Sequence, residues 1–146
     1  MQITSKFTIA VHLITAVDYF QDNQNVTSNF LAGSIGANPV IIRNVMSDLK
    51  EAGILEISQG KSGIHLAKDL SDITFLDIYK ALDCVSDEGL FHFHENSNTA
   101  CPVGRNIHKS VKPKLDSVQQ AMEEKLSQIS LAQVIEDTRQ AILNES

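Results

Sequence analysis

Apolar side chains recur at a spacing near 3.6 residues over the first twenty positions of the chain. Ile14 and Val17 belong to this face, and the pattern predicts an amphipathic helix over residues 5–20. A polar stretch then separates it from a shorter apolar segment, for which Thr27 or Ser28 provides a helix-capping side chain. The chain therefore begins with two consecutive helices.

The most clearly delimited helix of the sequence begins at Asn38-Pro39. Asparagine is a favoured N-cap, proline suits the first helical position, and Gly53 can take the positive φ that follows a helix end. The inward stripe of this helix is Ile42, Val45, Met46 and Leu49. Its other face carries Val40, Arg43, Asn44 and Ser47.

A β-hairpin is predicted directly after this helix. Two short apolar runs, 54–58 and 64–67, flank a turn that contains Gly60. Thr74 then caps a further short helix, while residues 84–105 show no periodicity.

The last third of the chain reads as helix again. Seven apolar residues are spaced 4, 4, 3, 4, 4 and 3 apart, which predicts one long helix that Pro113 either begins or bends near its start. Ser130 caps a final helix. The seven residues are Ile107, Val111, Leu115, Val118, Met122, Leu126 and Ile129.

The order of these elements is that of a winged helix-turn-helix. A short helix, a glycine turn and a sharply capped second helix form the helix-turn-helix, and the hairpin is the wing. The second helix fits a major groove about 12 Å wide, where its N-terminal residues reach base edges. The fold class predicted is mainly α with a small β-hairpin; the alternative is a helical packing unit with a surface hairpin.

Composition places limits on this interpretation. The chain has 146 residues, 42% of them hydrophobic, and its charge is 12 − 18 = −6, whereas a nucleic-acid binder normally has surplus Lys and Arg. Residues 1–70 hold five basic and six acidic side chains, and residues 71–146 hold seven and twelve, so the acidity belongs mostly to the second half. No apolar run spans a membrane and no secretory leader is visible, so we expect a cytoplasmic protein without membrane contact.

Several strings of the sequence resemble the Rrf2 family of bacterial transcriptional regulators. They are LKEAGIL at 49–55, GKSG at 60–63, ITFLDIYKAL at 73–82 and CPVG at 101–104, and the resemblance covers nearly the whole chain. It is strongest to a short branch with a CPVG loop. The resemblance implies a homodimeric, sequence-specific DNA-binding regulator, expected to be a repressor. Its parts would be a winged helix-turn-helix domain (1–83), a sensor loop (84–105) and dimerisation helices (106–146).

The resemblance also implies the residues that meet DNA and the partner subunit. A palindromic operator would be contacted from the start of the recognition helix and from the wing, by Asn38, Val40, Arg43, Asn44, Gln59 and Lys61. This wing is less basic than is usual in the family. The long C-terminal helix would cross between subunits through Ile107, Val111, Leu115, Val118, Met122 and Leu126.

The signal, if one is sensed, is expected at the 84–105 loop. Several relatives hold an iron–sulfur cluster on three cysteines there, but this chain has only Cys84 and Cys101, and such clusters need four ligands. His12, His92 and His94 could complete a set, so a cluster is an alternative, although no cofactor or metal is expected. Thiol oxidation at the two cysteines is a second alternative, and inert thiols with solvated histidines are a third.

Parts of the sequence suggest two other classes of function. His92 to Glu95 and Cys101 include acid, base and nucleophile types, but nothing in the sequence predicts a substrate pocket, so an enzyme is not expected. A protein-interaction module that acts through a partner enzyme, with weak or no DNA binding, is the stronger rival. A gel shift read against salt concentration separates this rival from a DNA-binding regulator.

Overall fold

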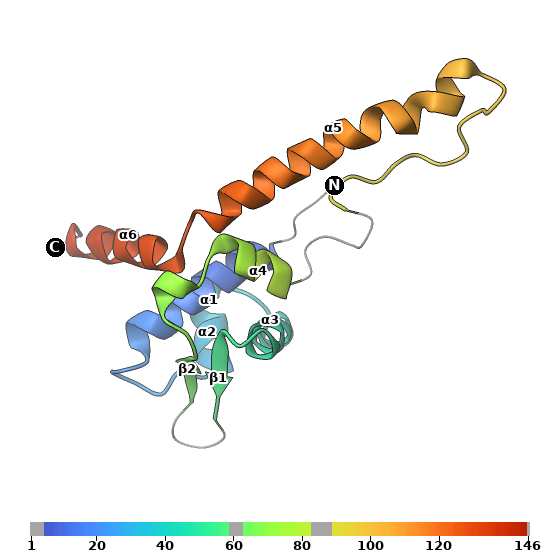
Figure 1. The fold of residues 1–146 in the computed structure, drawn as a ribbon. Helices are drawn as coiled ribbons and strands as arrows, with labels where there is room; N and C mark the ends of the chain where they lie inside the picture. Colours follow the sequence, from blue (N-terminus) through green and yellow to red (C-terminus); the bar gives the residue numbers. More distant parts are fainter. Residues whose placement is uncertain (1–4, 59–62, 83–88, 146) are drawn as a thin grey trace.

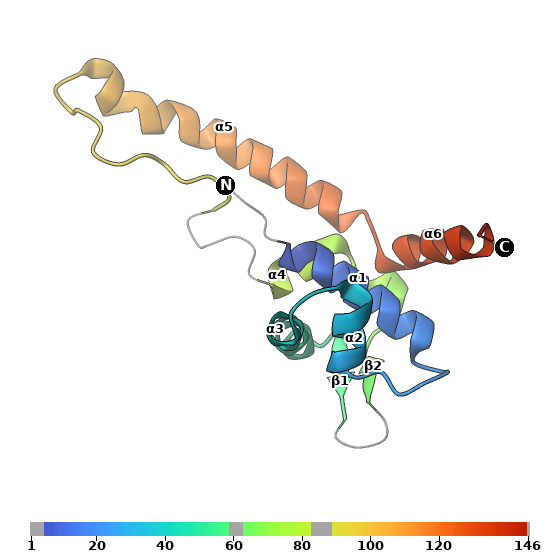
Figure 2. The same ribbon diagram turned by 180° about the vertical axis from the view of Figure 1, so that it is seen from behind.

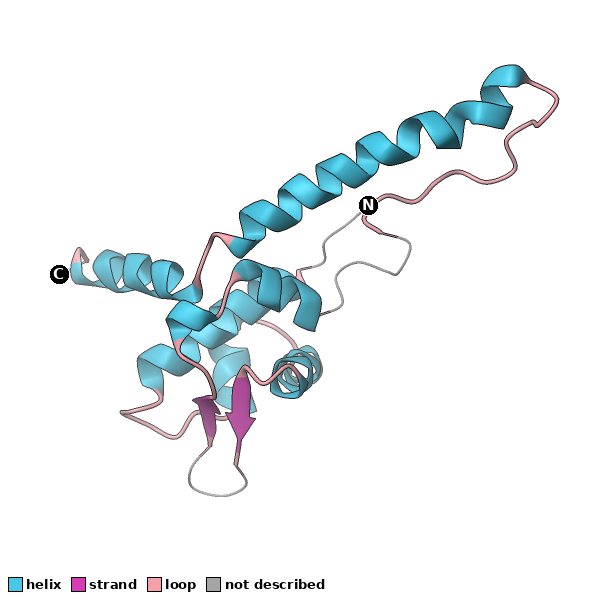
Figure 3. Ribbon diagram, viewed as in Figure 1, coloured by secondary structure: helices cyan, strands magenta, loops and turns pink. Residues whose placement is uncertain are grey.

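The computed structural model describes residues 5–58, 63–82 and 89–145. Its helices are α1 (Lys6–Phe20), α2 (Ser28–Ile35), α3 (Pro39–Glu51), α4 (Phe75–Ala81), α5 (Pro102–Ser127) and α6 (Leu131–Leu143). A short 3-10 helix, η1 (Leu70–Asp72), and two strands, β1 (Leu55–Ile57) and β2 (Ile64–Leu66), complete the described elements (Figures 1 and 3). The prediction of a mainly helical fold with a small hairpin is confirmed.

Local capping fixes the helix-turn-helix. The Asn38 side-chain oxygen accepts a hydrogen bond from the Val40 N–H at 2.8 Å, and Pro39 is the first residue of α3, as predicted. The Thr27 hydroxyl accepts from the Phe30 N–H at 3.1 Å and caps α2. Gly36 ends α2 with φ +75°, a conformation that glycine adopts without steric cost. The turn between α2 and α3 is therefore specified by its own residues.

The hairpin is held close to the α1–α2 linker. Its antiparallel strands pair Leu55 with Leu66 and Ile57 with Ile64, and the Ile64 N–H donates to the Val26 carbonyl at 3.2 Å. Gly63 has φ +64°, and a Cβ there would clash with Asn25 and with the Val26 carbonyl. Glycine at 63 thus lets the hairpin lie against the linker between α1 and α2.

One hydrophobic core joins helices α1 to α4, the hairpin and the start of α6. Its fully buried members include Leu13, Leu31, Ile42 and Ile78, together with Leu131 of α6. The connection to α6 is also hydrogen-bonded, because the Leu131 N–H donates to the Ile73 carbonyl at 2.8 Å. Residues 106–146, grouped above as dimerisation helices, therefore divide: α6 packs on the winged domain, and α5 does not share its core.

Helix α5 projects away from the winged domain (Figures 1 and 2). Its 26 residues correspond to about 39 Å at ~1.5 Å per residue, and none of them is buried. It begins at Pro102, so the last four residues of the predicted loop are helical, and Pro113 lies inside the helix rather than at its first turn. In the described part of the preceding segment, the Leu90 N–H donates to the Gln119 side chain at 2.8 Å, which ties that segment back to α5.

Candidate nucleic-acid interface

The first turn of α3 is the exposed end of the predicted recognition helix. Asn38 and Val40 are exposed there, and Arg43 and Asn44 are exposed in the next turn. The inward stripe of α3 is buried as predicted, at Ile42, Val45, Met46 and Leu49. The buried stripe fixes the rotation of the helix about its axis, and this rotation turns the four predicted contact residues outward.

Arg43 belongs to α3 and lies on the side of the helix that faces the wing. Its Nε donates to the Pro39 carbonyl at 3.3 Å, one turn back along the helix. Its side chain also lines a groove of about 350 Å³ that Met46, Ile57 and Ser58 share, and that extends to the start of α2. Arg43 thus lines a groove bounded by both predicted DNA-reading elements.

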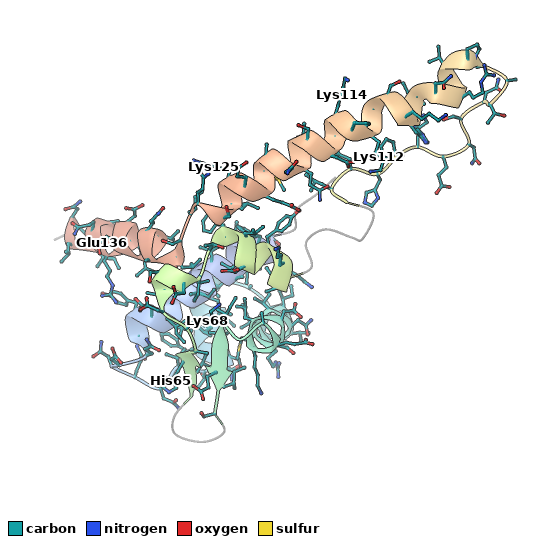
Figure 4. The ribbon with its side chains drawn as sticks, viewed as in Figure 1. His65, Lys68, Lys112, Lys114, Lys125 and Glu136 are labelled. Atoms are coloured by element: carbon teal, nitrogen blue, oxygen red, sulfur yellow. The ribbon has the colours of Figure 1, made fainter. Side chains whose placement is uncertain are left out.

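The charge around α3 suits a polyanion. Residues 23–47 contain a single charged side chain, Arg43, in a chain whose net charge is −6. No acidic residue occupies the first turn of α3, where the helix dipole would favour one. Farther along the wing, His65 lies on β2 and Lys68 follows it (Figure 4). Asp48 and Glu51 lie toward the end of α3, and Glu56 lies on β1. The part of this surface that is free of acidic side chains is thus the start of α3 and the segment before it.

The predicted wing contacts, Gln59 and Lys61, lie outside the described residues. The base of their turn is described: the Ser58 N–H donates to the Gly63 carbonyl at 3.0 Å. The role of these two residues stays a prediction.

The predicted interface stripe on α5 is only partly covered within one chain. Ile107, Val111, Leu115, Met122 and Leu126 are intermediate in exposure, and Val118 is 52% exposed. Lys112, Lys114 and Lys125 lie along the same helix (Figure 4), and Lys112 pairs with Asp116 at 2.7 Å. An apolar row between charged positions is typical of a helix that packs against another helix.

The predicted sensor residues occupy two separate regions. His12 lies on α1, with its Nε2 3.2 Å from the Ser34 hydroxyl, at a largely apolar groove of about 430 Å³ between α1 and α6. His94 lies near the N-terminal end of α5, with its Nε2 3.3 Å from the Ser97 hydroxyl. Exposed Cys101 directly precedes α5, exposed His92 lies in the segment before it, and Cys84 falls outside the described residues.

The sequence reasoning missed two residues, one beside His94 and one on α3. His108 packs edge-to-face against His94, with ring centroids 5.2 Å apart, and stacks obliquely on Phe93 at 4.9 Å. Ile41, in the first turn of α3, is 39% exposed although it is apolar. The helical spacing could have found Ile41, because position 41 falls outside the inward stripe that begins at 42.

An iron site needs several donor side chains close together. In residues 5–58, 63–82 and 89–145, no three side chains of His, Cys, Asp or Glu lie close enough to share a metal ion. His12 and His94 belong to regions at opposite ends of α5. The described donors of one chain thus do not fit an iron centre, and no step of the proposed function is assigned to one.

Known proteins match nearly the whole chain. The family model described as "Rrf2: Iron-dependent Transcriptional regulator" matches residues 3–137. YwnA of Bacillus subtilis (strain 168), assigned as an HTH-type transcriptional regulator, is 37% identical over 133 residues, which are 91% of this chain and 96% of YwnA.

Solved structures agree with this match. A crystal structure assigned as a DNA binding protein superposes with a TM-score of 0.71 at 32% identity, covering 90% of this chain and 99% of that one. A transcriptional regulator structure from Lactobacillus plantarum gives a TM-score of 0.73 at 25% identity, covering 97% of this chain and 99% of that one. The winged helix-turn-helix prediction is thus confirmed.

The described helices contain no segment long and apolar enough to cross a membrane. The family match also confirms that the chain is a transcriptional regulator rather than an enzyme. With its capped recognition helix, its wing and these matches along nearly its full length, this chain belongs to the Rrf2 family of HTH-type transcriptional regulators.

Proposed function

We propose that this chain works as a cytoplasmic homodimer that binds a palindromic operator and represses transcription by occupying it. The observation that carries the proposal is the first turn of α3, which is capped, free of acidic residues and exposed, with Arg43 beside it. A groove bounded by α3 and the wing continues that surface. Asn38, Val40, Arg43 and Asn44 are the proposed base-contacting residues, with Gln59 and Lys61 at the wing.

The homodimer is supported by the α5 stripe. A helix of about 39 Å without a buried residue leaves its apolar row only partly covered in a single chain, and a second copy would complete the cover. Oligomers of identical chains are mostly two-fold symmetric, so the same row would face itself. Two recognition helices related by a two-fold axis read two half-sites about 34 Å apart, which is why the operator is proposed to be palindromic.

Gel shifts against salt concentration test DNA binding. A duplex from the region upstream of the chain's own gene should shift at about 50 mM salt, because even non-specific binding is visible there. Arg43→Ala should weaken binding by about 1–3 kcal/mol for each half-site and relax sequence preference. Lys80→Ala is the control, because Lys80 is also an exposed helical cation but lies on α4; it should bind as the parent does.

Contrary results would separate the proposal from its rival. A parent protein that shifts no duplex at about 50 mM salt would refute DNA binding and favour a protein-interaction module. Equal loss in Arg43→Ala and Lys80→Ala would refute the assignment of α3 as the recognition helix. In cells, a reporter driven by the upstream region should be more active when the gene is deleted; lower activity would refute repression.

Light scattering tests the dimer. The parent should have twice the chain mass of 16.1 kDa, and Val118→Asp should shift the mass toward one chain because it puts a charge into the proposed apolar interface. Ser117→Asp is the control, since Ser117 is exposed and lies outside the stripe. A parent that stays monomeric, or two variants of equal mass, would refute the interface.

The signal-responsive part is proposed to be the 84–105 segment and the start of α5. Support comes from the exposure of Cys101 at the first turn of α5 and from the ring contacts of His94 with His108 nearby. A covalent change at this end of α5 would act on the helix proposed to join the subunits. Diamide treatment of the parent and of Cys101→Ser tests this assignment.

A further inference from the structure

The first turn of α3 exposes two large apolar side chains side by side. Val40 is 57% exposed and Ile41 is 39% exposed. The other large hydrophobic residues that are exposed in the described part of the chain, Val103, Val118 and Leu143, lie on α5 and α6. The described winged domain thus concentrates its exposed apolar surface at the tip of the recognition helix.

Local stability does not account for these residues. Valine and isoleucine are weaker helix formers than alanine or glutamate, and the first turn of a helix favours acidic side chains. Positions 40 and 41 of α3 carry neither a strong helix former nor an acidic residue, although Asn38 and Pro39 delimit the start of the helix well. A binding role is the remaining physical reason for apolar groups at this place.

The chemistry of the major groove supplies the complementary group. Among the edges of the base pairs, only the C5-methyl group of thymine is apolar, and apolar side chains contact it in direct readout. The segment 23–47 carries only the charge of Arg43, so this segment itself places no carboxylate against the phosphates that flank such a contact. A protein partner would also bury apolar groups, but its binding would not require that the neighbouring segment lack acidic side chains.

We infer that Val40, flanked by Ile41, reads the C5-methyl group of a thymine in each half-site. The operator would therefore carry a T·A pair at the position that the first turn of α3 faces. Arg43, one turn farther along, would contact the neighbouring base pair or its phosphate. This inference rests on the proposed DNA binding and adds the identity of the base.

The test begins with a random pool of double-stranded DNA. The full-length protein selects its preferred duplex at about 100 mM salt, and that duplex is remade with uracil in place of each thymine in turn, which removes only the methyl group. One symmetric pair of positions should lose affinity about fourfold per half-site, the value expected for one buried methyl group. Replacing thymine by uracil elsewhere should leave affinity unchanged.

Two variants assign the contact to its residue. Val40→Ala should bind the thymine and uracil duplexes equally, because the side chain that meets the methyl group is gone. Leu143→Ala is the control, since Leu143 is 64% exposed but lies on α6, and it should keep the parent's preference. Circular dichroism should show the parent's helix content in both variants, as both sites are exposed.

The outcomes distinguish the thymine contact from the proposed DNA binding on which it rests. A protein that binds no duplex refutes both. A protein that selects a duplex but binds its thymine and uracil forms equally at every position refutes the inference and leaves sequence-specific binding standing. A uracil effect that Val40→Ala does not remove also refutes the inference.

Discussion

Replacing Leu131 by alanine should destabilise the whole winged domain and not only the C-terminal helix. Leu131 is the first residue of α6 and is fully buried in the core shared with α1 to α4. Its N–H donates to the Ile73 carbonyl at 2.8 Å, and the Phe75 N–H donates to the Ile129 carbonyl at 2.9 Å. These bonds fasten the α5–α6 junction to the segment that leads into α4.

The expected magnitude follows from this burial. A leucine-to-alanine change at a fully buried site removes apolar contacts and leaves a cavity, which costs about 3 kcal/mol. Because native domains are stable by only about 5–15 kcal/mol, this loss is a large fraction of the total. For a chain of this size it corresponds to a fall of roughly 6–12 °C in Tm. The backbone hydrogen bonds should survive, since alanine keeps its N–H.

Urea unfolding followed by circular dichroism measures this loss. Parent and variant must be compared at one protein concentration, because dimer dissociation would shift the transition by mass action. Leu143→Ala, at the other end of α6, is the control: Leu143 is 64% exposed, and its replacement should change the free energy of unfolding by less than about 0.5 kcal/mol.

The reasoning is refuted by either of two results. A loss below about 1 kcal/mol in Leu131→Ala would mean that the site does not share the core. An unchanged main transition preceded by a separate loss of helix signal would mean that α6 unfolds independently. A single transition displaced to lower urea would support one cooperative core, through which the proposed dimerisation helix is held in a fixed position relative to α3.

Four further predictions concern capping, pH, salt and oxidation. Thr74→Ala should cost about 1 kcal/mol in urea unfolding, because the Thr74 side chain and its backbone N–H both bond to Asp77 in a capping box. The backbone N–H and then the hydroxyl of Ser71 lower the pKa of Asp69 from its usual 3.8; an NMR titration should therefore place it below that value. The associated stability is present above pH 3.8 and is lost as pH falls through the lowered pKa, and Asp69→Asn should remove this pH dependence. Lys61→Ala should reduce the slope of log affinity against log salt by about one per subunit with little change in sequence preference; an unchanged slope would argue against a phosphate contact. Treatment with diamide should change the DNA affinity of the parent but not of Cys101→Ser; equal responses, or thiols unchanged by mass spectrometry, would exclude a thiol switch at Cys101.

The sequence by itself determined the elements whose signals are local. Asn38 caps α3 by bonding to the N–H two residues later, and Ser130 caps α6 by accepting from the N–H of Gln133. Such bonds are set by residue type and spacing, so they can be predicted without knowledge of distant chain segments. The outward face of α3, with Arg43 and Asn44, followed in the same way from helical periodicity.

Only the tertiary structure decided how distant segments meet. The same apolar periodicity predicted both C-terminal helices, but α6 is buried at Leu131 and Ile135 whereas α5 has no buried residue. Periodicity shows that one face of a helix is apolar, but it does not show which segment packs against that face. The pairing of His12 with Ser34, and the need for glycine at 63, likewise depend on contacts between segments far apart in the sequence. Such contacts arise from the path of the whole chain, which no local pattern encodes.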